Sequence, residues 1–266
     1  MEQETVNKDT YKTLKEIKVS SEPGVKATIP MWKPNTNQVK LEESPISLFV
    51  ATPVHSECSI HYTQALLELQ QLCMKNKIKI TFSLIKSSLV TQGRNLCVAG
   101  FLESNYTHML FVDSDIYFDS PSILEMIKKD KELLSIPYPL KTIMWDKALC
   151  RIKEGSIKTI NDLKKSFNTY PMKVENNDNI NVDNGVMEVT HSPTGCMMIK
   201  RSVFDKMIKA YPDKNIVQKT VINGEYVDKP NLWNFFDTLH DPRTKTYMGE
   251  DFSFCQRWKD IGGKCY

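Results

Sequence analysis

The chain has 266 residues, of which 41% are hydrophobic and 25% are charged, a composition typical of soluble globular proteins. Its formal net charge of +3 is too small to indicate binding to nucleic acid or to a membrane. No apolar stretch approaches the roughly 20 residues of a membrane-spanning helix, and the N-terminal sequence lacks the apolar core of a signal peptide. Seven cysteines occur without Cys-x-x-Cys spacing, which favours reduced thiols and a cytoplasmic location.

Residues 1–45 are polar and contain scattered prolines, which predicts an N-terminal arm that is loosely packed or mobile. After the arm, apolar runs short enough for buried strands alternate with segments of helical periodicity. The predicted strands are ISLFVATP, IKITFSLIKS, THMLFVD and LLSIPYPLK, and the predicted helices between them are SIHYTQALLELQQLCMKN, GRNLCVAGFLES and PSILEMIKKDKE. This order predicts an α/β domain over residues 46–266, with a mostly parallel sheet flanked by helices.

The pattern is lost between residues 146 and 185, which are rich in Asn and charged residues. A long irregular insert in a compact domain is usually a functional lid or a disordered segment, so this stretch is a possible lid. Regular structure is expected to return with a strand, a Pro-Thr-Gly turn, another strand and a helix in GVMEVTHSPTGCMMIKRSVFDKMIKAY. A last helix is expected to start near Glu250.

Two aspartates, Asp113 and Asp115, directly follow the buried strand THMLFV. A carboxylate beside a hydrophobic run costs desolvation free energy unless a cation or a polar ligand meets it. Ligands bind beyond the carboxyl ends of parallel strands, and Mg²⁺ and Mn²⁺ prefer carboxylate oxygens. The pair is therefore a candidate metal and ligand site, although aspartates at this position can also simply stabilise a turn.

Three further groups are candidates for the same edge of the sheet. Glu250 and Asp251 open the last helix. The helix dipole favours carboxylates at this position, which is one explanation for the pair, and the other is that the pair includes a general base. Arg94 lies near the start of the second helix, where a guanidinium can contact a diphosphate or can simply face solvent. Thr52, Pro53 and Glu57 lie at or after the end of the first strand.

The aromatic segment NLWNFFDTLH contains Trp233, which either lines a sugar-stacking wall or belongs to the core, and a core position is the commoner case. The turn before the strand CMMIK places Thr194 and Gly195 next to that strand.

Six segments carry a resemblance to a known family over residues 46–266: VATPVHSE, GRNLCVAGFL, THMLFVDSDIYF, IPYPLK, SPTGCMMIKRSVF and GEDFSFCQRW. Together and in this order, they resemble the GT-A-fold, nucleotide-sugar-dependent glycosyltransferases of the inverting, family-two-like kind. The resemblance implies a Rossmann-like GT-A fold and metal-dependent transfer of a sugar. The donor is expected to be a UDP-sugar and the acceptor a hydroxyl of a glycan, protein or lipid.

The resemblance also implies a role for each candidate residue. Asp115 and Asp113 would hold Mn²⁺ or Mg²⁺, with Asp113 also near the ribose, and Asp251 would be the catalytic base with Glu250 beside it. The other implied positions are Thr52, Pro53, Glu57, Arg94 and Ser114 for the nucleotide-sugar, and Thr194, Gly195 and Trp233 on the acceptor side. Many members place a further histidine ligand after the acidic helix, but here no histidine follows His240.

Two other classes stay open. A sugar-phosphate nucleotidyltransferase would have the same kind of fold, but it typically has a Gly-rich loop with a basic residue after the first strand, and VATPVHSECS contains no glycine and no lysine. A non-catalytic binding protein could also retain the fold without turnover. A glycosyltransferase would release a nucleoside diphosphate, a nucleotidyltransferase would consume a triphosphate, and a non-catalytic protein would do neither.

Overall fold

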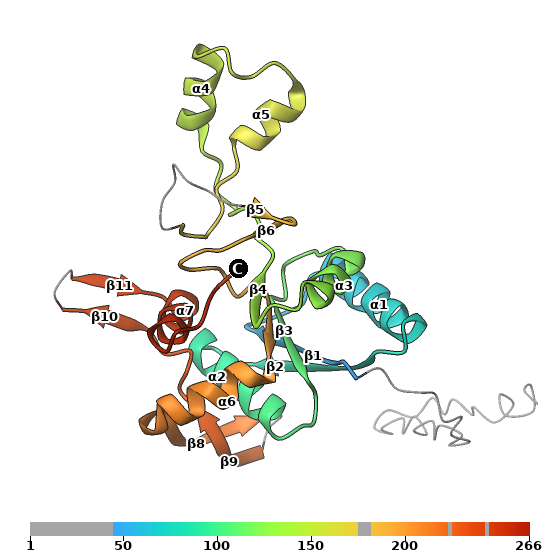
Figure 1. Cartoon of the computed structure of the whole chain (residues 1–266), viewed down its shortest axis with the longest axis vertical. Helices are drawn as coiled ribbons and strands as arrows, with labels where there is room; N and C mark the ends of the chain where they lie inside the picture. The colour runs from blue at the N-terminus through green and yellow to red at the C-terminus, as the bar shows by residue number, and fades with distance from the viewer. Residues whose placement is uncertain (1–44, 175–181, 223–224, 243–244) are drawn as a thin grey trace, which may run out of the picture. The chain divides into compact units, whose positions relative to one another are not determined.

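The computed structural model describes residues 45–174, 182–222, 225–242 and 245–266. The predicted N-terminal arm therefore lies outside the described residues, except for its last position. The described part is one α/β domain whose central sheet is mostly parallel, which confirms the predicted class (Figure 1). Within the described residues, no helix combines the length and the hydrophobicity needed to cross a membrane.

The central sheet has five strands in the order β2-β1-β3-β7-β4. Strands β1, β2 and β3 are parallel, β7 is antiparallel to β3, and β4 pairs antiparallel with β7 and so runs in the direction of β3. The strand bounds are β1 Ser47–Val54, β2 Lys79–Lys86, β3 His108–Val112, β4 Leu133–Ser135 and β7 Cys196–Lys200. β7, which comes later in the chain, thus lies between β3 and β4 in the sheet.

Alternating side chains of the sheet enter two hydrophobic clusters, one on each face. On β3, Met109 and Phe111 join one cluster, whereas Leu110 and Val112 join the other. The first cluster packs against helices α2 (Val90–Leu102), α6 (Arg201–Ala210) and α7 (Glu250–Asp260). The second packs against α1 (Ile60–Lys75) and α3 (Ser120–Lys129). Because β3 is covered on both faces, all five of its residues are buried.

The stretch predicted to be irregular contains two short helices, α4 (Trp145–Lys153) and α5 (Ile160–Ser166). Thr159 and Asp162 form a capping box that starts α5, and the rings of Trp145 and Phe167 meet edge to face with centroids 5.1 Å apart. The high density of polar residues in this stretch hides the helical spacing in the sequence. Its role as a lid stays a prediction.

Among the described residues, three further sheets have two strands each. They pair β5 (Val182–Asp183) with β6 (Val186–Met187), β8 (Asn215–Ile222) with β9 (Glu225–Trp233), and β10 (Leu239–Asp241) with β11 (Thr246–Met248). A short 3-10 helix, Pro212–Lys214, connects α6 to β8.

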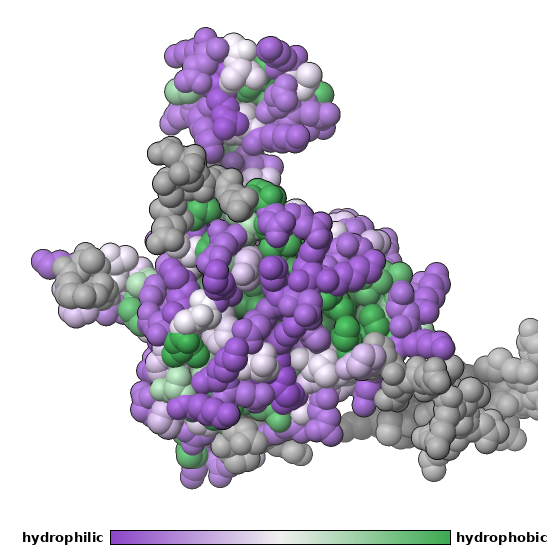
Figure 2. All heavy atoms as spheres, viewed as in Figure 1, coloured by the Kyte–Doolittle hydropathy of each residue, from purple (hydrophilic) through white to green (hydrophobic). Residues whose placement is uncertain are grey.

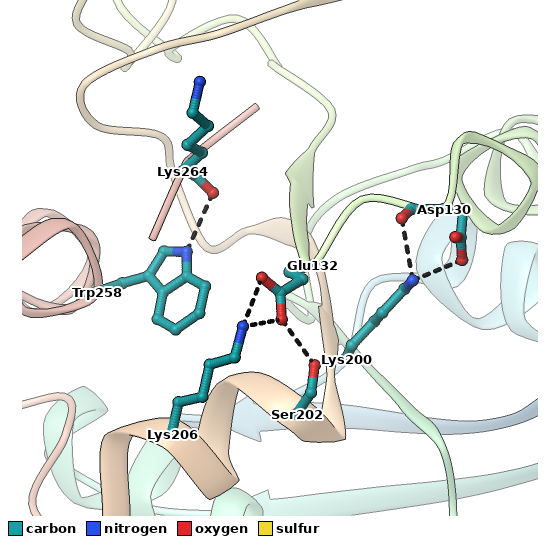
Figure 3. A network of polar contacts seen from close by, with 7 residues as sticks. All are labelled: Asp130, Glu132, Lys200, Ser202, Lys206, Trp258 and Lys264. Atoms are coloured by element: carbon teal, nitrogen blue, oxygen red, sulfur yellow. Dashed lines mark hydrogen bonds and ion pairs between the residues drawn. The ribbon is translucent and has the colours of Figure 1, made fainter. Parts of the chain in front are cut away.

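Polar contacts fasten the loop between α3 and β4 to α6 (Figure 3). Lys206 contacts both carboxylate oxygens of Glu132 at 2.7 and 3.0 Å, and the Ser202 hydroxyl donates to the same carboxylate at 2.9 Å. In the same region, the indole Nε1 of Trp258 donates to the carbonyl of Lys264 at 3.0 Å, which holds the end of the chain against α7 (Figure 3).

We predict that Gly263→Ala destabilises the domain by about 1–3 kcal/mol, the usual cost of overpacking. A Cβ at this position would lie 2.0–2.4 Å from atoms of the Trp258 indole, so the ring would have to move from its place in the core. Gly100→Ala is the control, because its Cβ would meet only Phe49 at an ordinary 3.6 Å. Urea denaturation measures both variants, and equal stabilities would contradict the packing argument.

Candidate active site

The end of β3 places Asp113 at the carboxyl edge of the parallel strands. Its backbone N–H donates to the carbonyl of Gly195 at 3.0 Å, which joins the end of β3 to the start of β7. Ligands of open α/β sheets bind beyond this edge. The position of the two aspartates at the end of a buried strand is therefore as the sequence predicts.

Arg94 is the cation that meets Asp113. Its Nη2 lies 3.0 Å from Oδ1 of Asp113, and its Nε lies 3.3 Å from Oε1 of Glu250. Only 4% of the Arg94 side chain is exposed, and its guanidinium lies over the Phe111 ring at 5.4 Å. The arginine therefore joins the end of β3 to the start of α7.

The electrostatics of Arg94 follow from this position. Burial alone would lower its pKa, but the carboxylates of Asp113 and Glu250 outweigh burial, and the pKa is raised. The guanidinium thus stays charged. Its Nη1 is buried and has no hydrogen-bond partner among the described residues. A buried donor without a partner costs free energy, so Nη1 is suited to an acceptor that a ligand brings.

Asp115 lies two residues further along the chain and has a different partner. Lys141 Nζ lies 2.6 Å from its Oδ2, with 82% of the Lys141 side chain and 54% of the Asp115 side chain exposed. The hydrogen bond to Asp115 raises the pKa of Lys141. Asp113, Asp115, Tyr138 and Lys141 all line one cavity of about 590 Å³. An exposed ion pair contributes little, so Asp115 can exchange this partner for a ligand at low cost.

Glu250 and Asp251 begin α7 next to this cluster but have unlike surroundings. Glu250 is engaged by Arg94, whereas no basic side chain of the described residues forms an ion pair with Asp251. The Asp251 carboxylate accepts from the N–H of Phe252 at 2.7 Å. Burial, followed by the neighbouring charge of Glu250, raises the pKa of Asp251. Of the two carboxylates, Asp251 is the one free to accept a proton.

The residues predicted around the first strand occupy three different environments. Thr52 is fully buried, and its hydroxyl is hydrogen-bonded to that of Tyr62, so its side chain lies in the interior. Pro53 is partly buried and Glu57 is exposed. The carbonyl of Ser114 accepts from the N–H of Ser59 at 2.8 Å, which ties the loop after β3 to the start of α1.

On the predicted acceptor side, Thr194 and Gly195 are buried and directly precede β7. Tyr138 packs on Gly195 so closely that a Cβ there would lie 2.4 Å from the Tyr138 hydroxyl oxygen. Trp233 is partly buried and stacks on Phe235 with centroids 5.5 Å apart, at the edge of the core. The structure therefore brings Gly195 to the site through Tyr138 and puts Trp233 with the core aromatics.

Tyr138 and Lys141 are site residues that the sequence did not single out. Burial, then the charge of Asp113, raises the pKa of Tyr138, so its hydroxyl stays protonated. Both residues belong to IPYPLK, which follows β4. Because β4 runs in the direction of β3, its end reaches the same edge of the sheet, and this topology was the signal for them.

The described residues contain no group of three or more His, Cys, Asp and Glu side chains placed to hold a metal ion. Two carboxylates at the cavity, Asp113 and Asp115, are the available donors. Mg²⁺ commonly takes one or two carboxylates and completes its shell with water and phosphate oxygens. The donor set fits a cation bound in that way, with Asp115 as the more accessible ligand.

No protein-family model matches the chain, and no characterised protein sequence matches it. Among solved structures, the crystal structure of A197 from STIV is similar with a TM-score of 0.39 and 15% identity, and the alignment covers 80% of this chain and 78% of that one. This similarity is too low to support an argument about activity.

We predict that Arg94→Met destabilises the fold by about 3–5 kcal/mol, because it leaves Asp113 and Glu250 without their shared buried partner. Lys141→Met is the matched control, since it breaks an exposed pair and should leave the free energy of unfolding close to that of the wild type. Chemical denaturation compares the two variants. A loss of similar size in both would mean that Arg94 does not hold the site together.

We predict a pH-dependent gain in stability for Asp251→Asn. Because the folded-state pKa of Asp251 is raised, the wild type gains stability from this group at low pH and loses that gain as the pH rises through the folded pKa. The variant has no charge to bury, so it should unfold at a higher temperature than the wild type at about pH 7, and the difference should shrink toward about pH 4. Glu250→Gln, which removes an ion-pair partner of Arg94, should instead lose stability at pH ~7.

Proposed function

We propose that this protein is a metal-dependent glycosyltransferase of the GT-A fold that transfers a sugar from a nucleotide-sugar, most simply a UDP-sugar, to an acceptor hydroxyl with inversion. The observation that carries the proposal is the meeting of Asp113, Asp115, Arg94, Glu250 and Asp251 beyond the carboxyl end of β3, where Arg94 forms ion pairs with both Asp113 and Glu250. These residues come from three of the six segments that resemble the family.

The donor diphosphate is the ligand that the basic groups of the site favour. Arg94 presents a charged guanidinium whose Nη1 lacks a partner, and Lys141 lies at the open cavity. Guanidinium groups bind phosphate oxygens through several N–H donors at once. In the proposed complex, Arg94 contacts the diphosphate or donor sugar while Asp113 orients Arg94 and approaches the ribose.

Asp115 and Asp113 would hold the divalent cation, Mn²⁺ or Mg²⁺. When bound, such an ion neutralises charge on the departing diphosphate. Asp115 would release Lys141 to do so, and Lys141 would then be free to contact a phosphate oxygen from the same cavity. The chain itself supplies few ligands, so the nucleotide is expected to complete the site.

Asp251 is proposed as the general base that takes the proton of the acceptor hydroxyl. Its carboxylate is not held in an ion pair by any described residue, and its raised pKa makes it a better proton acceptor than an ordinary aspartate. Glu250, by contrast, is engaged by Arg94 and is proposed to position the base and the arginine. Gly195, against which the cavity residue Tyr138 packs, is proposed to lie on the acceptor side, whereas Thr194 is buried and Trp233 packs with the core aromatics.

A panel of nucleotide-sugars tests the proposed function, with released nucleoside diphosphate as the readout. Slow hydrolysis of one donor supports a glycosyltransferase, and consumption of a nucleoside triphosphate with a sugar phosphate would indicate a nucleotidyltransferase instead. The absence of turnover and of any thermal shift with every donor would indicate a non-catalytic protein.

We expect Asp251→Asn to lower the rate with the active donor by about 10²- to 10⁴-fold while donor affinity is nearly unchanged, because the variant lacks a base but keeps the size of the side chain. Asp260→Asn is the control, an exposed aspartate at the other end of α7. Near-normal activity of Asp251→Asn would move the base elsewhere, with Glu250 as the first residue to test.

We expect weak Mn²⁺ binding to the protein alone and much tighter binding with UDP, because phosphate oxygens complete the coordination shell. Linkage requires Mn²⁺ to tighten UDP binding by the same factor. Calorimetric titration of UDP with and without Mn²⁺ measures this factor in the wild type and in Asp115→Asn. If the variant retains the full factor, Asp115 is not the metal ligand.

A further inference from the structure

An exposed set of apolar side chains lies on and just before α4. Trp145, Leu149 and Ile152 are 61%, 51% and 50% exposed. They occupy positions i, i+4 and i+7 of the helix and therefore form one stripe. Three more exposed apolar residues precede the stripe, and we call the whole set the α4 face: Leu140, Ile143, Met144, Trp145, Leu149 and Ile152.

Single exposed apolar residues are normal on a protein surface, but a contiguous set marks an interaction site. The α4 face has six such residues within a short segment, and its spacing is that of an amphipathic helix. Its polar residues Lys147 and Arg151 lie on the opposite side of the helix. In Figure 2, the side of the α4–α5 pair turned to the viewer carries mostly hydrophilic side chains.

The same part of the chain concentrates positive charge. Residues 141–165 contain seven Lys and Arg against three Asp and Glu, a net charge of +4, whereas the whole chain has a net charge of only +3. The small net charge of the whole chain therefore hides a local basic cluster. A basic, amphipathic segment with Trp, Leu and Ile on one face has the chemistry of a helix that lies in the surface of an anionic membrane.

We infer that the α4–α5 pair docks on an anionic lipid surface. The α4 face enters the boundary between headgroups and acyl chains, with the Trp145 ring at the level where aromatic rings are favoured. The positive charge of Lys147, Arg151 and their basic neighbours, on the polar side of the helix, attracts the segment to the negative headgroups. This mode of binding lies on the membrane and does not cross it, and it requires neither donor nor metal.

The position of the α4 face along the chain connects it to the candidate active site. Leu140 belongs to the α4 face and also lines the cavity with Asp113, Asp115 and Lys141. Trp145 follows the cavity residue Thr142 by three positions. The segment that touches the membrane would therefore also meet an acceptor hydroxyl carried by a lipid. This assignment of the acceptor class rests on the proposed function, but the docking itself does not.

Sedimentation with vesicles tests the docking, with the full chain and no donor present. The wild type should bind vesicles of phosphatidylcholine with phosphatidylglycerol and should bind pure phosphatidylcholine much more weakly. Binding should fall at high salt, because the charge attraction is screened. Leu149→Glu should weaken binding by about tenfold or more, since it puts a charge where an apolar side chain enters the interface.

Leu67→Glu is the matched control, because Leu67 on α1 is 57% exposed, close to the value for Leu149. It should bind vesicles like the wild type, and equal melting temperatures of the two variants show that both are folded. Lys147→Ala should lower binding to the anionic vesicles by about fivefold.

Absence of vesicle binding by the wild type, or equal binding by both Glu variants, would overturn the inference. A stable dimer that Leu149→Glu dissociates, with no vesicle binding, would assign the α4 face to a second copy of the chain instead. Failure of every donor to react would leave these outcomes unchanged.

Discussion

The guanidinium of Arg94 lies between Asp113 and Glu250, two carboxylates that come from widely separated parts of the chain. The three side chains belong to or directly follow α2, β3 and α7, so a single buried cation fixes the relative positions of the elements that build the site. Taking such charges out of water is costly, and an apolar replacement of the whole set is often as stable. The arrangement is therefore better explained by what it positions than by its net stability. It holds Glu250 and leaves the adjacent Asp251 without an ion pair.

The same interaction separates two functions that the sequence treats as one acidic pair. Glu250 and Asp251 are neighbours in the first turn of a helix, where the helix dipole favours both carboxylates. In the structure, the carboxylate of Glu250 contacts Arg94, and the carboxylate of Asp251 is half-buried and has a raised pKa. Asp113 and Asp115 are divided in a similar way, since the first meets a buried cation and the second meets a lysine that solvent surrounds. Each acidic pair thus provides one fixed and one available carboxylate.

Local patterns were enough to predict β1, β2 and β3, which are short apolar runs separated by periodic helices, and to place Asp113 at the edge of the sheet. They did not show that β7 lies antiparallel between β3 and β4, or that the predicted strand LLSIPYPLK ends at Ser135. They could not show that Arg94 meets Glu250, since these residues are 156 positions apart and no periodicity links them. They also could not show that the Thr52 hydroxyl turns inward to Tyr62, because a polar residue at a strand end is equally compatible with a ligand. The helices α4 and α5 were missed for a further reason. The many polar residues of this segment hide the helical spacing of its few apolar ones.

The strand order has a consequence for the folding of the nascent chain. β7 lies between β3 and β4 in the sheet but follows β3 by more than eighty residues in the sequence. At about 5–20 residues per second, the ribosome would take roughly 4–17 s to supply the strand that covers this edge. During that interval, a strand that is apolar from Met109 to Val112 has an open hydrogen-bonding edge, which is the feature that leads to pairing between chains. The nascent chain is therefore most exposed to pairing with other chains between the synthesis of β3 and that of β7, before the carboxylate of Glu250 exists to complete the contacts of Arg94.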